Sequence, residues 1–185
     1  MQQFNRIMII GKSGSGKSTF AIKLKQLLGI PIYHLDKYFF VDHWVERNYN
    51  EFIAIQNKMI TESTWIIDGN STKSYEMRYK RAELCIYFNF PLWRCYLRIV
   101  KRLFYKHPNI DDRAPNCHET IRWSLIKYLW GFENRVNPIL QRLRATYPSV
   151  QFVELKSDRD VRLFYNSLGS LHSEIQHVHN NIDNG

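Results

Sequence analysis

The chain has 185 residues, of which 44% are hydrophobic and 23% charged, and its formal net charge is +9. This length and apolar content suffice for one buried core and do not require two domains. No run approaches the roughly 20 apolar residues of a membrane span, and the start of the chain lacks an apolar signal region, so we expect a cytoplasmic protein. Its three cysteines, Cys85, Cys95 and Cys117, are too widely spaced for a metal site or a redox pair, which favours reduced thiols.

The first predicted strand leads into a phosphate-binding motif. Residues 7–10 form a short apolar run typical of a buried parallel strand, and residues 19–28 predict a helix. Between them, residues 11–18 fit the P-loop pattern G-x-x-x-x-G-K-[ST] at every fixed position. The glycines permit a tight path that turns backbone N–H groups toward a phosphate, and the start of the helix adds further donors. The candidate nucleotide-binding residues are Gly11, Ser13, Gly14, Ser15, Gly16, Lys17, Ser18 and Thr19.

Two of these side chains have predicted roles in the chemistry. Lys17 is expected to reach the β- and γ-phosphates of ATP, and the Ser18 hydroxyl is expected to bind Mg²⁺. The alternative is a Gly/Ser loop that matches by chance, for which the odds are about one per cent or less at average glycine usage. The motif therefore predicts a nucleotide site.

The second predicted strand, over residues 31–35, is closed by Asp36. Ligands of open α/β sheets lie beyond the carboxyl ends of the strands, which makes Asp36 a candidate to orient or deprotonate an acceptor. The alternative is that Asp36 caps the segment that follows. Phe40 and Trp44 come next and are either the wall of an acceptor pocket or ordinary core residues.

A third strand follows a helix predicted over residues 51–62. The apolar run Trp65-Ile66-Ile67 ends at Asp68, in the manner of a Walker B motif, where the carboxylate can hold Mg²⁺ beside the P-loop serine. Asp68-Gly69 is also an ordinary turn signal, so the assignment depends on the P-loop that precedes it.

The positive charge is concentrated between residues 73 and 106. This segment has nine Lys/Arg and two Asp/Glu, a net charge of +7. It contains a fourth strand, predicted over residues 84–90, and an amphipathic helix, predicted over residues 92–105. Arg94, Arg98, Lys101 and Arg102 share one face of that helix, and Tyr96, Ile99, Val100 and Leu103 share the opposite face. The basic face serves phosphates, attracts a polyanion such as DNA, or is simply solvated.

Residues 106–117 have two prolines and no periodicity, which predicts an exposed loop in the position of a mobile lid, about 106–120, that contains Arg113. Helices are predicted over residues 120–130 and 135–147, and a fifth strand over 150–155. Ser157 and Asp160 have the spacing of a capping box that opens a last helix. We expect one domain over residues 1–170 and a polar tail over 171–185, whose His172, His177 and His179 suit a frayed end better than a metal site.

With these motifs in place, the chain resembles the bacterial DNA topology modulation protein family, a branch of the adenylate-kinase-like P-loop proteins. The resemblance extends over about residues 4–168 and is carried by the P-loop, the strand end at 33–36, residues 65–70, the strand end at 88–90 before Pro91, and the Arg-rich helix. It implies a three-layer P-loop NTPase fold with a five-stranded parallel sheet, a lid, and ATP with Mg²⁺ as ligands. By the same resemblance, Arg98, Arg102 and Arg113 are lid arginines that bind the transferring phosphoryl group, and Lys156 and Ser157 border the adenine.

The chain departs from nucleoside monophosphate kinases in one respect. Those enzymes have Asp-Gly-x-Pro-Arg at the third strand end, where the arginine binds the acceptor phosphate, whereas Asn70, Ser71 and Thr72 follow Asp68-Gly69 here. Asn70 and Arg78 are the candidates for the acceptor contact that this arginine would make. A hydroxyl acceptor, unlike an anionic phosphate, gains from a carboxylate that removes its proton, which suits Asp36.

The sequence therefore predicts an ATP-dependent kinase that phosphorylates a nucleoside, a nucleotide or another small acceptor. The alternative is an ATP-dependent, DNA-associated regulator whose segment 73–106 binds nucleic acid. No helix-turn-helix, zinc-finger or RNA-binding signature is visible in the sequence, so we expect only weak, non-specific DNA binding.

Overall fold

The computed structural model describes residues 4–41, 43–104 and 128–182, of which residues 103, 104 and 171–182 are described by their backbone only. The predicted lid with Arg113, Cys117 and most of the helix predicted over 120–130 lie outside these residues.

Five parallel strands form the central sheet, in the order β2-β3-β1-β4-β5. The strands are β1 (Arg6–Gly11), β2 (Ile32–His34), β3 (Trp65–Asp68), β4 (Leu84–Phe88) and β5 (Gln151–Leu155). The three central strands, β3, β1 and β4, are buried almost throughout. Continuous apolar runs are typical of strands covered on both faces. The predicted five-stranded parallel sheet is confirmed.

Seven α-helices and a 3₁₀ turn connect the strands among the described residues. They are α1 (Lys17–Leu28), α2 (Leu35–Phe39), α3 (Tyr49–Thr61), the turn Thr72–Ser74, α4 (Tyr75–Tyr79), α5 (Leu92–Phe104), α7 (Phe132–Thr146) and α8 (Asp158–Ile182).

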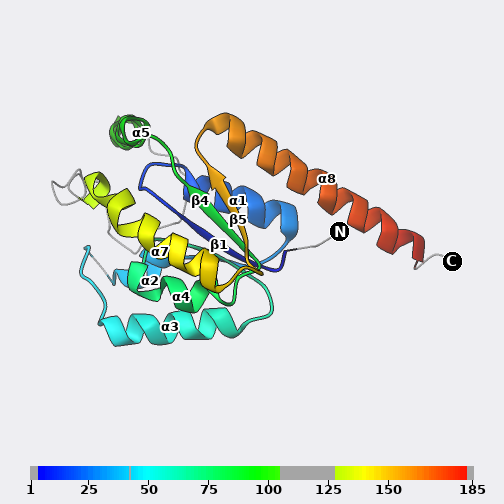
Figure 1. Ribbon diagram of the computed structural model, residues 1–185, viewed down its shortest axis with the longest axis horizontal. Coiled ribbons are helices and arrows are strands. Elements are labelled where there is room, and N and C mark those ends of the chain that lie inside the picture. Colours follow the sequence, from blue (N-terminus) through cyan, green and yellow to red (C-terminus); the bar gives the residue numbers. More distant parts are fainter. Residues whose placement is uncertain (1–3, 42, 105–127, 183–185) are drawn as a thin grey trace.

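Two hydrophobic cores lie on opposite faces of the sheet, because successive side chains of a strand point to opposite sides. Met8 and Ile67 pack with residues of α3, α4 and α7, whereas Ile7 and Ile86 pack with residues of α1, α5 and α8. Figure 1 shows this arrangement, with α3, α4 and α7 on one side of the sheet and α1 and α8 on the other. The result is the predicted three-layer architecture.

The second and fourth strands are shorter than predicted. β2 pairs with β3 only as far as His34, which lies opposite Asp68, and β3 ends there. Without a neighbouring strand to bond to, the chain turns at Leu35 into α2, so Asp36 lies in the first turn of a short helix rather than at a strand end. β4 likewise ends at Phe88, where its pairing with β1 and β5 stops.

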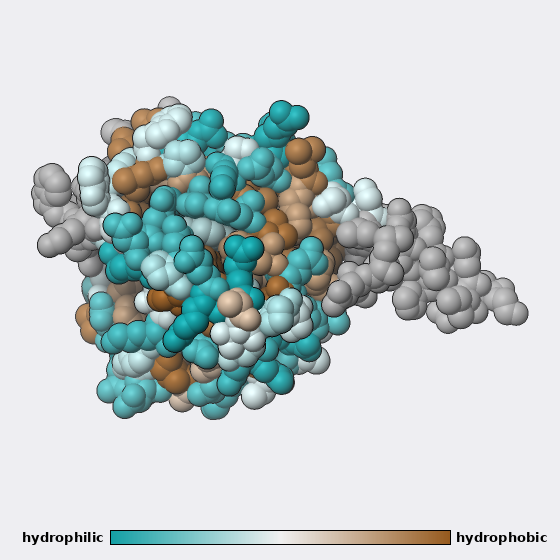
Figure 2. Space-filling view, in the orientation of Figure 1, coloured by the Kyte–Doolittle hydropathy of each residue, from teal (hydrophilic) through white to brown (hydrophobic). Residues whose placement is uncertain are grey.

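Helix α5 buries only part of its apolar face. Cys95 and Ile99 are buried, whereas Trp93, Leu97 and Val100 are exposed, so Ile99 and Val100 of the one apolar face differ in burial. The reason is that α5 packs against the P-loop with its arginine-bearing side turned inward. Figure 2 shows hydrophobic residues among hydrophilic ones at the surface over α5.

Helix α8 continues to Ile182, into the region where a frayed tail was predicted. Leu171, Ile175, Val178 and Ile182 recur at helical spacing in the sequence, which accounts for the continuation. No helix among the described residues is long and apolar enough to span a membrane.

Candidate active site

The P-loop connects the end of β1 to the start of α1, and two neighbouring elements pack directly on it. A Cβ at Gly11 would lie 2.5 Å from the carbonyl oxygen of Phe88, and a Cβ at Gly14 would lie 2.5 Å from that of Cys95. Gly14 has φ +78, which side-chain-bearing residues rarely adopt. β4 and α5 therefore fit against the loop only because these two positions are glycine.

The start of α1 has the features of an anion site. Gly16 precedes Lys17 without a side-chain cap, and no acidic residue lies in the first turn. The exposed N–H groups and the positive end of the helix dipole are thus available to a phosphate. The ammonium of Lys17 donates to the carbonyl oxygen of Lys12, 3.1 Å away, and so folds across the loop.

Asp68 is buried at the end of β3, next to the P-loop. Its Oδ2 accepts hydrogen bonds from the Ser18 hydroxyl at 2.8 Å and from His34 Nδ1 at 3.0 Å. Burial by itself raises the pKa of Asp68, but the His34 bond, the nearby charge of Lys17 and the Ser18 bond outweigh it, and the pKa is lowered. The carboxylate is therefore held ionised.

The other oxygen of Asp68, Oδ1, is buried and has no hydrogen-bond partner among the described residues. A buried, unpaired carboxylate oxygen is costly unless a ligand satisfies it. Mg²⁺ in kinase sites is held by one or two protein oxygens together with substrate phosphates and waters. The donor pair Asp68 Oδ1 and Ser18 Oγ fits such an ion.

Arg98 lies against the P-loop, as a phosphate-binding role requires. Its Nη1 donates to the Ser15 carbonyl oxygen at 2.8 Å, its Nη2 donates to Asp158 Oδ1 at 2.6 Å, and its guanidinium carbon lies 4.8 Å from the centre of the Phe90 ring. Arg102 lies one turn further along α5 and is partly buried. Catalytic roles for Arg98 and Arg102 stay predictions, and Arg113 lies outside the described residues.

A second lysine of the P-loop, Lys12, is turned into the protein. Its buried ammonium donates to Asn89 Oδ1 at 3.0 Å and to the Phe90 carbonyl oxygen at 2.8 Å, and it pairs with Glu133 of α7. All three N–H donors of the ammonium are thereby used. Lys12 fastens the loop to β4 and α7 and is not a free phosphate ligand.

Asn70 and Arg78, predicted to bind the acceptor, bond to backbone groups of the P-loop and of the loop after β3. Asn70 accepts from the Gly11 N–H at 3.1 Å and donates back to the Gly11 carbonyl oxygen. Arg78 is 0% exposed and donates to the carbonyl oxygens of Gly69 and Ser71 at 3.1 and 3.0 Å. Burial lowers its pKa to about 10. These bonds hold the loop after β3 in place, and contact of either side chain with an acceptor stays a prediction.

The remaining acceptor candidates lie on α2 and the turn after it. Asp36 is exposed in the first turn of α2, and the Phe40 and Trp44 rings meet edge to face with centroids 5.0 Å apart. Burial raises the pKa of the Tyr128 phenol; Arg135 opposes this shift, and the charge of Asp36 adds to it.

Lys156 and Ser157 lie between β5 and α8, in the predicted capping box. The Ser157 hydroxyl accepts from the Asp160 N–H at 3.2 Å, and Asp160 Oδ2 accepts from the N–H groups of Lys156 and Ser157, each at 2.9 Å. The capping box is confirmed. Contact of Lys156 and Ser157 with adenine stays a prediction.

The sequence-based reasoning missed three residues of this site, because the sequence does not show which residue each of them bonds to. His34 is the last residue of β2 and lies opposite Asp68 at the carboxyl edge of the sheet. This shared strand-end position is the signal that could have identified it. Lys12 occupies a variable position of the P-loop pattern. Asp158 lies inside the capping box at a position that the motif leaves open.

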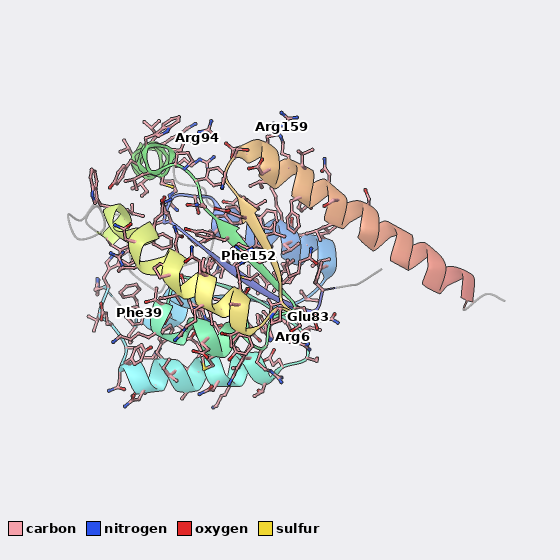
Figure 3. The ribbon with its side chains drawn as sticks, in the orientation of Figure 1. Arg6, Phe39, Glu83, Arg94, Phe152 and Arg159 are labelled. Atoms are coloured by element: carbon pink, nitrogen blue, oxygen red, sulfur yellow. The ribbon has the colours of Figure 1, made fainter. Side chains whose placement is uncertain are left out.

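These residues all lie at the carboxyl ends of the strands, where ligands of open parallel sheets bind. Figure 3 shows Arg94 of α5 at this end of the molecule, whereas Arg6 and Glu83, which precede the buried parts of β1 and β4, lie at the opposite end.

No protein-family model matches the chain, and no curated protein sequence matches it. Solved structures do match. Shikimate kinase from Bacteroides thetaiotaomicron aligns with a TM-score of 0.53 and 17% identity, over 91% of this chain and 98% of its own. Deoxyadenosine kinase from M. mycoides, with its products dCMP and dCDP bound, aligns with a TM-score of 0.50 and 16% identity, over 90% and 99%. Shikimate kinase from Acinetobacter baumannii, in complex with shikimate, aligns with a TM-score of 0.49 and 12% identity, over 95% and 93%. The chain has the P-loop NTPase fold in its nucleoside-monophosphate-kinase-like form.

Proposed function

We propose that this protein is an ATP-dependent kinase that transfers the γ-phosphoryl group of ATP to a hydroxyl group of a small molecule. The observation that carries the proposal is Asp68, a buried and ionised carboxylate whose Oδ2 is bonded to Ser18 and His34 and whose Oδ1 is left unpaired beside the P-loop. A turn at a strand end does not require a buried carboxylate with an unpaired oxygen, whereas a site for a nucleotide and its metal ion does.

The P-loop would bind the β- and γ-phosphates through its backbone N–H groups and the start of α1. Lys17 would move its ammonium from the Lys12 carbonyl oxygen to the phosphates, exchanging a neutral acceptor for an anionic one. Ser18 and Asp68 would hold Mg²⁺, which when bound neutralises charge on the phosphates. Arg98, and Arg102 one turn along, would stabilise the charge that develops on the transferring group.

Asp36 would orient the acceptor and take its proton. It is exposed, in the first turn of α2. Arg78, the arginine predicted to bind an acceptor phosphate, is buried and donates to backbone carbonyl oxygens. A neutral hydroxyl acceptor, which needs a base more than a cation, therefore fits the described residues better than a nucleoside monophosphate does.

The experiment that tests this function measures ATP turnover with a panel of candidate acceptors. The panel holds nucleosides, nucleoside monophosphates, sugars and hydroxy acids, and shikimate and deoxyadenosine are included because kinases named for them share the fold. We expect phosphorylation of at least one hydroxyl compound and none without Mg²⁺. A kinase function would be contradicted if the protein bound ATP but no compound in the panel received phosphate faster than ATP is hydrolysed by water.

A further inference from the structure

Asp158, the first residue of α8, faces two arginines of α5. Its Oδ1 accepts from Arg98 Nη2 at 2.6 Å, and its Oδ2 lies 3.6 Å from Arg94 Nη1. The labels in Figure 3 place Arg94 on α5 and Arg159 on the first turn of α8 at the same end of the molecule. One carboxylate thus joins two helices that are far apart in the sequence.

The helix itself does not require the Asp158 carboxylate. Ser157 and Asp160 close the capping box between them and use the N–H groups at residues 156, 157 and 160. These bonds fix the backbone on both sides of Asp158. Its carboxylate is therefore placed by a rigid support while remaining available for α5.

Arg98 is fixed by three contacts from three parts of the fold. The P-loop supplies the Ser15 carbonyl oxygen, α8 supplies Asp158, and the end of β4 supplies the Phe90 ring beneath the guanidinium. The planar fork of an arginine that makes two bonds in different directions has little freedom left. Of the three contacts, only the one to Asp158 is charged.

The pair adds little to fold stability. The side chains of Arg98 and Asp158 are 33% and 56% exposed, and exposed ion pairs contribute little because solvent screens them. The pair instead determines the direction in which the guanidinium points. Because the guanidinium lies at the rim of the P-loop, its orientation affects how it contacts a reacting phosphate.

We infer that Asp158 is a positioning residue for phosphoryl transfer, which holds Arg98 at the P-loop rim in the orientation that the transition state requires. This inference rests on the proposed kinase function. A group oriented in advance costs no reorganisation when charge develops, so its loss lowers kcat more than it weakens ground-state binding. Asp158 also follows Lys156 and Ser157, the predicted adenine border, and so links the two ends of the nucleotide site.

The kinetic test uses Asp158→Asn, which keeps the shape and removes the charge. We expect kcat to fall about tenfold, while affinity for MgATP is unchanged or higher, because a negative charge near the phosphates has been removed. Asp158→Glu should recover most of the lost rate. In an Arg98→Ala background, Asp158→Asn should have no further effect, since the two residues act through the same interaction. The matched control is Glu76→Gln, which breaks the exposed pair with Arg142 at 3.1 Å on another part of the surface and should change nothing.

A second measurement does not depend on turnover. The NMR signal of the Arg98 side-chain Nε–H, assigned by its loss in Arg98→Ala, should show an ordered side chain in the wild type, in Asp158→Glu and in Glu76→Gln. In Asp158→Asn it should show a mobile one.

Three results for Asp158→Asn would overturn the inference. The first is an ordered Arg98 side chain, and the second is a kcat that is unchanged or raised. The third is a parallel fall in kcat, MgATP affinity and melting temperature, because such a fall marks a structural role. The failure of the proposed function looks different, because the wild-type protein itself would then either not bind MgATP or bind it without transfer to any acceptor. In that case the NMR result still decides whether Asp158 orders the Arg98 side chain.

Discussion

Asp68 uses its two carboxylate oxygens differently. Oδ2 is occupied by Ser18 and His34, and Oδ1 has no partner among the described residues. His34 donates from Nδ1, because an ionised carboxylate can only accept. Under the proposed function, His34 keeps Oδ2 bonded to the protein, and Oδ1 would bind the metal.

Replacing Asp68 with Asn tests this division. The amide can still bond within the protein but is a poor Mg²⁺ ligand, so we expect ATP affinity without metal to stay within about threefold and the gain from Mg²⁺ to disappear. Calorimetric titration with ATP, with and without Mg²⁺, measures both. Asp160→Asn removes a carboxylate used only in the α8 cap and should keep the gain. A full Mg²⁺ effect in Asp68→Asn would show that the metal is held elsewhere.

Asp36→Asn tests the acceptor side. Because Asp36 is exposed and its proposed role is toward the acceptor rather than the nucleotide, we expect normal MgATP binding. The transfer rate to a hydroxyl acceptor should be lower by roughly 10² to 10⁴, the usual size of a general-base contribution. Steady-state kinetics and a binding titration on the same variant measure the two quantities. If MgATP binding falls in step with turnover, Asp36 belongs to the metal site or the fold.

At the scale of elements, the P-loop is held by two helices, α5 and α7. α5 contacts it through Arg98 and Ser15, and α7 contacts it through Glu133 and Lys12. α5 also approaches the loop closely at Gly14, where a Cβ would lie 2.5 Å from the Cys95 carbonyl oxygen. The shape of the loop therefore depends on where α5 packs.

Gly14→Ala should disturb this packing, and Gly29→Ala is its control. Both glycines have positive φ, +78 and +70, but a Cβ at Gly14 would meet the Cys95 carbonyl oxygen at 2.5 Å, whereas a Cβ at Gly29 meets nothing within 4 Å. We expect Gly29→Ala to cost about 1 kcal/mol of unfolding free energy from backbone strain alone, and Gly14→Ala about 1–3 kcal/mol more from the clash. Urea unfolding measures both. MgATP affinity should fall only in Gly14→Ala, and equal effects of the two variants would contradict the packing of α5 on the loop.

The strands were predictable because a parallel strand covered on both faces is a continuous apolar run, as in Ile7–Ile10 and Trp65–Ile67. The end of β2 was not, because the apolar run continues to Leu35 while the pairing with β3 stops at His34. Strand ends depend on a neighbour that local sequence does not reveal. The same holds for the exposure of Val100, since which face of α5 is covered depends on where the P-loop lies.

In the site, the residues of a fixed motif were predictable, and those that act through a distant partner were not. Lys17, Ser18 and Asp68 follow from the P-loop and the strand end. The scaffold roles of Arg78 and Asn70 come from backbone carbonyl and N–H groups nearby in space, which carry no sequence signature. Asp158 and Glu133 pair with residues 60 and 121 positions away.

At the scale of the whole molecule, the net charge of +9 does not by itself define a nucleic-acid surface. In the basic segment 73–106, Arg78 is buried and Arg98 lies on the P-loop. These positions favour a phosphate-binding function inside the fold over a duplex on its surface.

Arg98→Ala separates the two functions. We expect Arg98→Ala to lower kcat tenfold or more while ATP affinity changes less. With or without the substitution, DNA binding should be weak and independent of sequence, and it should be lost between about 50 and 150 mM salt. Fluorescence anisotropy with a labelled duplex gives the salt dependence. Unchanged turnover, together with a log K against log salt slope smaller by about one unit, would favour the DNA-associated alternative.

The central claim, that the P-loop binds MgATP, is tested most directly by unfolding the protein with and without MgATP. Wild-type protein should gain about 2–4 kcal/mol of stability at concentrations from 100 to 1,000 times Kd. Lys17→Met should lose most of this gain with little loss of stability in the absence of ligand. Among the described residues Lys17 donates to one backbone carbonyl oxygen, and its charge is one of several groups that keep Asp68 ionised. Lys23→Met, at an exposed position of the same helix, should behave as wild type. A wild-type protein that gains nothing from MgATP would contradict the account.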